Sequence, residues 1–211
     1  MSRIIILLFV CSSFFLTAHA RKSGSVGHPH KPVRVLLVGA PNNVKSNYYY
    51  DELIAEQISI PVDSIEWQFN QLVALNLEDM EQKAGFDFIL LSPSQQGWTE
   101  LTDHLEVTGE GQSCSSDLAN LSTATYQDLL LQVEADYLLV LNQHYLKWQE
   151  QPMRTLFHIL SYSIYDKNKQ LIYSGNEFFT SMKLEKLDRM AKSIKKPSEK
   201  IGKELIRLIQ Q

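Results

Sequence analysis

The sequence predicts an α/β (α+β) fold: a mixed sheet of five to six strands with an antiparallel C-terminal meander and helices packed on it. Two observations lead to this fold class. Strand patterns first alternate with helical patterns along the chain, which is typical of parallel strands joined by helices. Three strand patterns then follow one another with short polar gaps, which is typical of antiparallel hairpins.

Residues 1–20 have the three-part pattern of a cleavable secretory signal, with a basic start, an apolar run at 4–16 and small residues in Ala18–Ala20. The run is too short to span a bilayer, which takes about 20 apolar residues. Cys11 lies inside the run without a small residue before it, so there is no lipidation signal. We therefore expect a periplasmic or secreted protein that begins at Arg21 and has no transmembrane segment.

The lead-in at 21–32 is rich in Gly, Ser and Pro and has little to bury, so we expect it to be flexible. A single domain is expected over 33–211. It opens with a β-branched apolar run at 33–39, which Gly39 ends and which predicts a buried strand. Apolar residues at helical spacing predict a helix at 48–58.

Apolar and polar residues alternate at 65–70, which predicts a half-buried strand. A short helix is expected at 77–84, where Gly85 stops it, and a second buried strand at 86–91. The segment 92–121 shows no period and is rich in Ser, Gly, Thr and acidic residues. We expect a long loop there, and loops of this length in compact domains are usually functional.

A helix is expected at 122–133 with Ser122 or Thr123 as its N-cap, because their hydroxyl groups can accept a backbone N–H. It runs into the apolar strand 135–141. The meander is expected at 137–148, 155–165 and 170–179, with a turn at 166–169.

Two amphipathic helices are expected at the end of the chain, one at 183–194 and one starting at Pro197. Apolar residues recur on one face of each, with lysines between them. We expect this face to cover the sheet. The open alternative is peripheral contact with an anionic membrane through the basic helices.

The chain has 20 basic and 24 acidic residues, for a net charge of −4. The acidic residues are concentrated in 33–182, whereas 183–207 is basic. An acidic body argues against nucleic-acid binding, which needs a basic surface.

Cys114 is the one cysteine left after removal of the signal, so no internal disulfide is expected. It lies in a polar stretch, 109–117, that we expect to be exposed. His104 lies ten residues before it and is a candidate base for a thiolate nucleophile. No known catalytic signature surrounds the two residues, so an incidental thiol is the favoured interpretation.

His144 and His158 stand directly opposite each other if their strands pair about a turn centred on Gln151. Opposed imidazoles can bind a metal or act as a pH switch. No third ligand is near them in the sequence, so packed core histidines are the default. His28 and His30 in the lead-in form a second, looser metal candidate.

Asp87 and Asp136 each enter an apolar strand from a loop, and two such carboxylates can pair as acid and base. Solvation at a sheet edge explains the same placement, and we favour it. The loop after Gly39 lacks the glycine spacing that binds phosphate. The sequence therefore predicts no catalytic residues and no cofactor.

Residues 122–209 resemble a recurrent envelope domain. The motif is Glu134–Leu141 (Glu-Ala-Asp-Tyr followed by apolar residues), a strand at Phe157–Tyr165, the turn and strand Asp166–Gly175, and a closing helix. It is similar to the periplasmic domain of the curli-secretion channel lipoprotein, to the amino-terminal domain of the Tol-system propeller protein, and to lipoproteins that activate penicillin-binding proteins. The resemblance implies binding and assembly, with an envelope protein as partner.

The sequence is therefore compatible with two functions. The favoured one is an exported, non-catalytic interaction module of the cell envelope. The alternative is a small exported hydrolase that uses Cys114 or the pair His144 and His158. Convergence of these side chains in one pocket would favour the hydrolase, and scattering would favour the module.

Overall fold

The computed structural model describes residues 32–95, 97–109, 111 and 113–210. The expected signal at 1–20, the lead-in up to residue 31, and His28 and His30 lie outside these residues and stay predictions.

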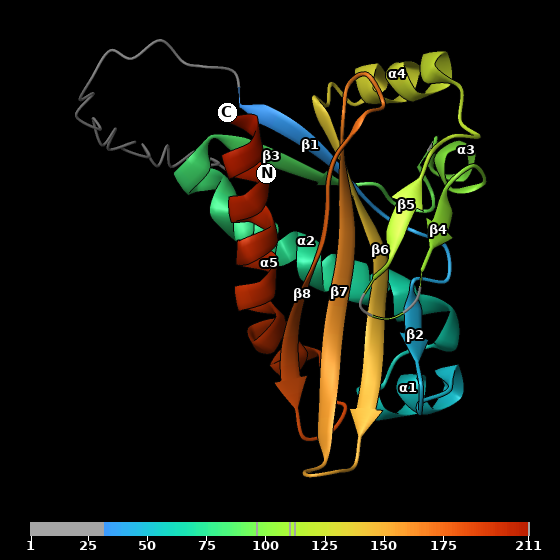
Figure 1. The fold of residues 1–211 in the computed structure, drawn as a ribbon, viewed down its shortest axis with the longest axis vertical. Helices are drawn as coiled ribbons and strands as arrows, with labels where there is room; N and C mark the ends of the chain where they lie inside the picture. The colour runs from blue at the N-terminus through green and yellow to red at the C-terminus, as the bar shows by residue number, and fades with distance from the viewer. Residues whose placement is uncertain (1–31, 96, 110, 112, 211) are drawn as a thin grey trace, which may run out of the picture. The chain divides into compact units, whose positions relative to one another are not determined.

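A mixed six-stranded sheet forms the centre of the fold, as the sequence predicts (Figure 1). The strand order is β3-β1-β6-β7-β8, and β2 pairs with β6 beyond the end of β1. The strands β3, β1, β2 and β6 are parallel, whereas β6, β7 and β8 form the antiparallel meander. The strands of this sheet are β1 (Val33–Gly39), β2 (Val44–Ser46), β3 (Phe86–Leu90), β6 (Tyr137–Gln149), β7 (Thr155–Asp166) and β8 (Leu171–Ser181).

Helices and a small hairpin cover the two faces of the sheet. The first face packs against α1 (Asp51–Ile58), α2 (Ile65–Ala84) and α5 (Leu187–Ile209), and a 3₁₀ turn at Val62–Ser64 precedes α2. The second face packs against α3 (Trp98–Thr102), α4 (Thr123–Gln132) and the hairpin of β4 (Glu106–Thr108) with β5 (Ser115–Asp117). Because both faces are covered, the apolar residues of β1 point alternately into two separate cores.

Residues 65–70 form the first turns of α2, so the predicted strand is wrong. Ile65, Phe69, Val73 and Leu77 are buried and lie four residues apart, which places them on one face of a helix. The alternation at 65–70 covers too few residues to separate the two periods. The helical face appears only when the window extends to Leu77.

The segment 92–121, expected to be a loop, contains α3, β4 and β5. Four of its leucines are buried against the second face of the sheet, and these are Leu101, Leu105, Leu118 and Leu121. They are too widely spaced along the chain to show a period. The segment is therefore a layer of the fold rather than a long loop.

The two predicted terminal helices are one helix, α5, with Pro197 inside it. A proline inside a helix lacks one backbone N–H and crowds the preceding turn. Buried residues on both sides of it, Ile194 and Ile201, hold the two halves against the sheet layer. The apolar face of α5 thus lies in the core, as expected, and only its charged side remains for contact with an anionic surface.

Candidate functional site

A β-bulge in β6 arranges the polar residues at the centre of the sheet. Pairing with β7 shifts between Leu141 and Gln143, so Asn142 is the extra residue. The side chains of Asn142 and Gln143 both bond to groups on the second face, whereas His144 packs on the first. A bulge permits two successive side chains to face one way before alternation resumes.

His144 and His158 contact each other inside the first core. His144 Nε2 lies 3.2 Å from His158 Nδ1, and both residues are buried. The prediction that they stand directly opposite is wrong, because His144 pairs with Leu160 and His158 with Leu146. A turn centred one residue later than Gln151 causes this offset. A two-residue offset keeps both side chains on one face, so they still meet.

The hydrogen bonds around the pair assign its tautomers. Ser181 Oγ donates to Lys183 O at 2.7 Å, so it accepts from His158 Nε2 at 3.2 Å. His158 Nδ1 is then the acceptor for His144 Nε2–H. His144 Nδ1 carries no proton and has no partner. This assignment applies to two neutral rings.

Burial enforces this neutral state. Loss of hydration lowers the pKa of His158 to about 3 and also lowers the pKa of His144, where the neighbouring His158 adds to the effect. The space around the rings is filled by Phe69, 4.6 Å from His144 between ring centres, and Phe179, 4.2 Å from His158. No cluster of three or more His, Cys, Asp or Glu side chains that could hold a metal occurs in the described part of the chain. The two histidines are thus a polar pair in the core.

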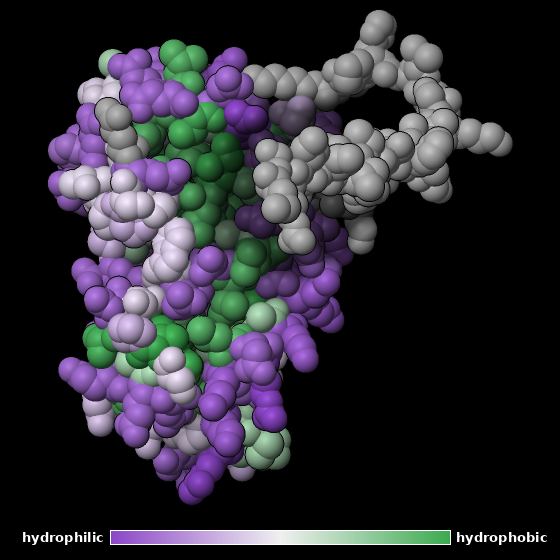
Figure 2. Space-filling model, turned by 180° about the vertical axis from the view of Figure 1, so that it is seen from behind, coloured by the Kyte–Doolittle hydropathy of each residue, from purple (hydrophilic) through white to green (hydrophobic). Residues whose placement is uncertain are grey.

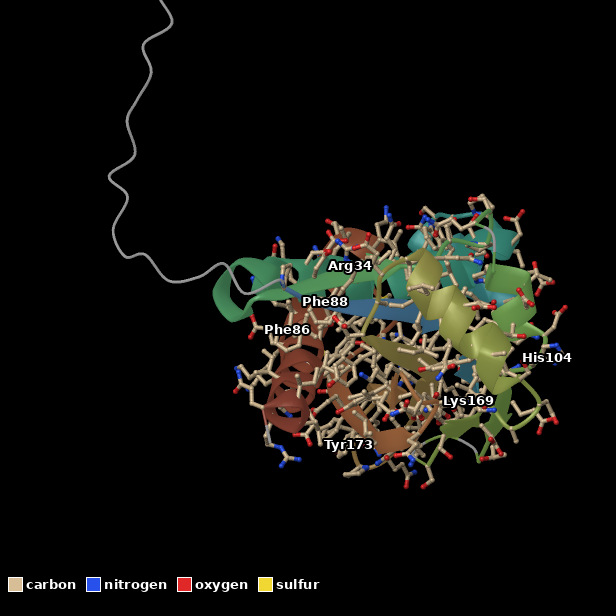
Figure 3. All side chains as sticks on the ribbon, turned by 90° about the horizontal axis from the view of Figure 1, so that it is seen from above. Arg34, Phe86, Phe88, His104, Lys169 and Tyr173 are labelled. Atoms are coloured by element: carbon tan, nitrogen blue, oxygen red, sulfur yellow. The ribbon has the colours of Figure 1, made fainter. Side chains whose placement is uncertain are left out.

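Cys114 is buried, with 4% of its surface exposed, so the expectation of an exposed thiol is wrong. Its Sγ donates to Gln143 Oε1 at 3.2 Å, and the backbone N–H of Gly111 donates to the same oxygen at 3.0 Å. These bonds fold the polar stretch onto β6. His104 is exposed and lies at the periphery after α3 (Figure 3).

Asp87 and Asp136 both bind Arg34 of β1. The Arg34 Nε donates to Asp87 Oδ2 at 2.7 Å, and the Arg34 backbone N–H donates to Asp136 Oδ2 at 3.0 Å. A guanidinium and a backbone amide of one residue therefore hold the two carboxylates at the start of the parallel strands. These bonds agree with the structural role that the sequence favoured.

The candidate catalytic residues do not converge. Gln143, the partner of Cys114, and His144 are consecutive in β6 and point to opposite faces of the sheet. The sheet thus separates the thiol from the histidine pair. Neither arrangement in the hydrolase alternative has a nucleophile beside an available base.

Two hollows lie on either side of β2, and the sequence interpretation missed both. The first, the bulge cleft, has a volume of about 480 Å³ and lies between the segment after β1, the β4 hairpin and the β6 bulge. It is lined by Pro41, Asn42, Lys45, Ser46, Leu105, Val107, Gly109, Asn142, Gln143 and Tyr145. The polar pair Asn142-Gln143 interrupts the apolar run of β6, and this interruption was the available signal.

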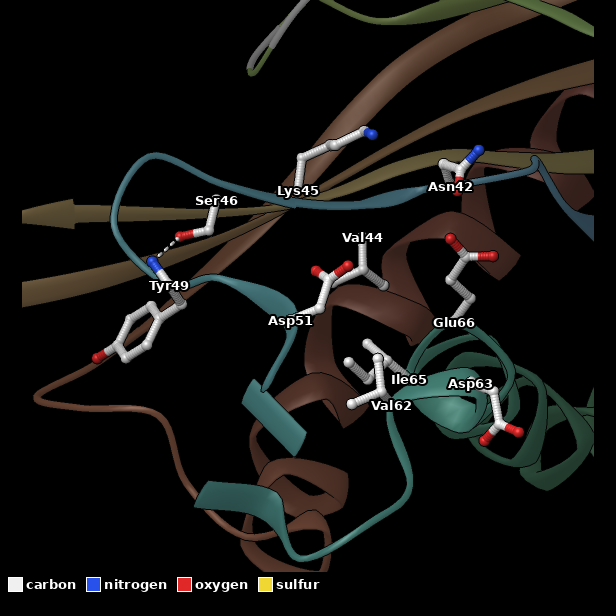
Figure 4. A pocket seen from close by; sticks show the side chains of 10 residues that line it. All are labelled: Asn42, Val44, Lys45, Ser46, Tyr49, Asp51, Val62, Asp63, Ile65 and Glu66. Atoms are coloured by element: carbon white, nitrogen blue, oxygen red, sulfur yellow. Dashed lines mark hydrogen bonds between the residues drawn. The ribbon is translucent and has the colours of Figure 1, made fainter. Parts of the chain in front are cut away.

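The second hollow, the acidic pocket, has a volume of about 390 Å³ and is lined by Asp51, Asp63 and Glu66 among other residues (Figure 4). Burial raises the pKa of the Glu66 carboxyl group, while a hydrogen bond from the Asn42 backbone N–H and the charge of Lys45 partly offset this rise. The carboxylate of Glu66 thus anchors the turn between β1 and β2.

No family model and no curated protein matches the chain. Three solved structures show distant similarity at 10% sequence identity. A dodecamer of a PelC variant from Paraburkholderia phytofirmans has a TM-score of 0.41, covering 84% of this chain and 88% of that one. A hypothetical protein from Chlamydia trachomatis has a TM-score of 0.46, covering 84% and 95%. A protein from Xanthomonas campestris has a TM-score of 0.25, covering 83% and 90%.

Similarities this distant assign no function. None of these three structures is from the curli, Tol or penicillin-binding-protein activator families, so that resemblance stays a prediction. Among the described residues, no helix is long and apolar enough to cross a membrane.

Proposed function

We propose that the protein is an exported, periplasmic or secreted interaction module of the cell envelope that acts by binding another protein rather than by catalysis. The sequence pattern at 1–20 supports export. The separation of Cys114 from the histidine pair supports binding over hydrolysis.

The outer edge of β8 is the observation that carries the proposal. This strand is last in the strand order, so its outer side pairs with no other strand of the sheet. Exposed β edges are templates for pairing with a further chain, and soluble proteins usually protect them with charges or prolines. The side chains of β8 that face solvent are uncharged, and these are Leu171, Ser174, Asn176, Phe178 and Thr180.

The one charged residue of β8 points away from this surface. Glu177 lies on the side of the strand that packs against α5, where its Oε2 accepts a hydrogen bond from Lys200 Nζ at 2.7 Å. Phe178 is 58% exposed, and Met182 beyond the strand is 81% exposed. An apolar band also reaches the surface on the face opposite to that of Figure 1 (Figure 2). An extended segment of a partner protein fits the edge of β8 by strand addition.

Photo-crosslinking in intact cells tests this proposal. A photoreactive amino acid at Phe178 should give one discrete protein adduct in the envelope fraction. The matched control places it at Leu131, which is 75% exposed but belongs to α4 and not to the edge strand. Equal adducts from both positions, or none from Phe178, would contradict binding at the β8 edge.

A further inference from the structure

The bulge cleft lies where the crossover connections of the parallel strands diverge. β1 has β3 on one side and β6 on the other. The connection from β1 to β3 packs on the first face through α2, and the connection from β3 to β6 packs on the second face through α3 and α4. Open α/β sheets bind ligands at such a point, beyond the carboxyl ends of the strands. The cleft begins at Pro41, two residues after the end of β1.

Lys45 supplies a positive charge at this position. It lines the cleft and is exposed. Its side chain points to the side of β2 opposite Asp51 and Glu66 (Figure 4). Among the residues that the structure describes, no carboxylate forms an ion pair with it. Lys45 also lines the acidic pocket and its charge lowers the pKa of Glu66, but with no ion pair among the described residues its ammonium group can still bind an anion.

Asn142 supplies a hydrogen-bond acceptor. Its Nδ2 donates to Cys114 O at 3.2 Å and to Ser163 Oγ at 2.9 Å, which uses both amide protons. Its Oδ1 is buried and has no partner, although the residue lines the cleft and is only 1% exposed. A buried acceptor without a donor is costly, and a ligand N–H or O–H would satisfy it.

Apolar side chains complete the walls. Leu105 and Val107 contribute from the β4 hairpin, and Tyr145 contributes from β6. The volume of about 480 Å³ is within the range of small-molecule sites. The neighbouring Gln143 Oε1 is already occupied by Cys114 and Gly111, so it adds no acceptor.

From these groups we infer that the bulge cleft binds a small carboxylate that carries a hydrogen-bond donor and an apolar group. The carboxylate pairs with Lys45, the donor satisfies Asn142 Oδ1, and the apolar group packs on Leu105 and Val107. An N-acylamino acid has this chemistry, whether it is free or is the carboxyl-terminal residue of a polypeptide. This site is separate from the β8 edge and does not depend on the function proposed there.

N-acetyl-L-leucine is a probe with all three groups, and two relatives each lack one. Its methyl ester lacks the charge, and 4-methylpentanoate lacks the N–H. Two-dimensional NMR titration of the folded protein should show saturable shifts of the backbone amides of Asn42, Gly109 and Tyr145 with N-acetyl-L-leucine. Each relative should bind about tenfold more weakly, because the ester loses the ion pair with Lys45 and 4-methylpentanoate loses the hydrogen bond to Asn142 Oδ1. The titration leaves Asn142 unaltered, because its amide group bonds to Cys114 O and Ser163 Oγ and its substitution would disturb both contacts.

Lys45→Met should weaken binding of N-acetyl-L-leucine about tenfold, whereas Lys167→Met, at the exposed turn after β7, should leave it unchanged.

A tripeptide that ends in leucine distinguishes a free N-acylamino acid from the carboxyl terminus of a polypeptide. The same tripeptide with a carboxyl-terminal amide is the control. Tighter binding of the tripeptide acid than of N-acetyl-L-leucine indicates a polypeptide terminus, and equal or weaker binding indicates a free acid. Absence of saturable shifts, equal binding of acid and ester, or unchanged binding in Lys45→Met would overturn the inference.

Discussion

His144 donates a hydrogen bond through Nε2 to His158 Nδ1, 3.2 Å away, inside the core between the sheet and α2. Neither ring faces a carboxylate. The groups around them are the rings of Phe69 and Phe179 and the Ser181 hydroxyl. This hydroxyl in turn donates a hydrogen bond to Lys183 O. The two histidines are therefore neutral imidazoles buried in the core, and protonation of either ring opposes folding.

Stability should accordingly fall as the pH drops below about 6.5, the ordinary pKa of histidine. Burial lowers both pKa values in the folded state, to about 3 for His158. Between these limits the unfolded chain binds more protons, so the free energy of unfolding decreases by up to about 1.4 kcal/mol per pH unit for each histidine. Urea denaturation at pH 7.5, 6.5, 5.5 and 5.0 measures this slope.

The double variant His144→Gln/His158→Gln is the control for that slope. It removes both histidines, so its free energy of unfolding should depend much less on pH above about 5, where carboxylates of ordinary pKa are largely ionised. Glu66, whose pKa is raised by burial, is present in both proteins and affects both slopes alike. The same slope in both proteins would contradict the neutral buried pair.

Cys114 should react slowly with a thiol reagent in the folded protein and fully in urea, because it is 4% exposed and bonded to Gln143. The matched control is Ser113→Cys in a Cys114→Ser background, since Ser113 is exposed and adjacent. That variant should react rapidly without urea. Equal rates of thiol modification for the folded unaltered protein and the folded Ser113→Cys variant would contradict the burial of Cys114.

Leu205→Ala should lower the free energy of unfolding by about 2–5 kcal/mol, because Leu205 is fully buried in the first core. Lys203→Ala, two residues away on the exposed side of the same helix, should change it by less than about 0.5 kcal/mol. Thermal melts and urea denaturation measure both. Unchanged stability of Leu205→Ala, together with flotation of the protein on anionic vesicles, would instead indicate a membrane-surface helix.

The strands of the meander and the first strand were predictable because their residues carry strong local signals. The apolar run at 33–39 is a buried parallel strand with both faces covered. Ser122 caps α4 by accepting a hydrogen bond from the Thr125 backbone N–H at 3.0 Å. At the turn after β7, Asp166 Oδ1 accepts from the backbone N–H groups of Asn168 and Gln170, although the left-handed residue is Lys169.

The errors arise where contacts distant in sequence decide the structure. No residue near Cys114 in the sequence indicates that its thiol will donate a hydrogen bond to Gln143. The turn between β6 and β7 is centred one residue later than Gln151, which shifts the register of His144 and His158. The β6 bulge at Asn142 is likewise not predicted by any short pattern. Local sequence rules predict a break in the helix at Pro197. The helix α5 nevertheless continues through this residue, because residues on both sides of it are packed in the core. The bulge cleft follows from the same long-range pairing, so its residues could not be assembled from the sequence.

The edge of β8 is tested most directly by the yield of the envelope adduct formed through a photoreactive residue at position 178. Thr180→Lys and Ser174→Lys each place a charge on the solvent-facing side of the strand. Ser174→Lys also removes the hydrogen bond from Ser174 Oγ to Tyr162 O, so Thr180→Lys is the cleaner of the two variants. Both should abolish the adduct, while Lys167→Ala, at the turn before β8, should leave it at the wild-type level. Equal adduct yields in Thr180→Lys, Ser174→Lys and the otherwise unaltered protein, with all variants folded, would contradict binding through this edge.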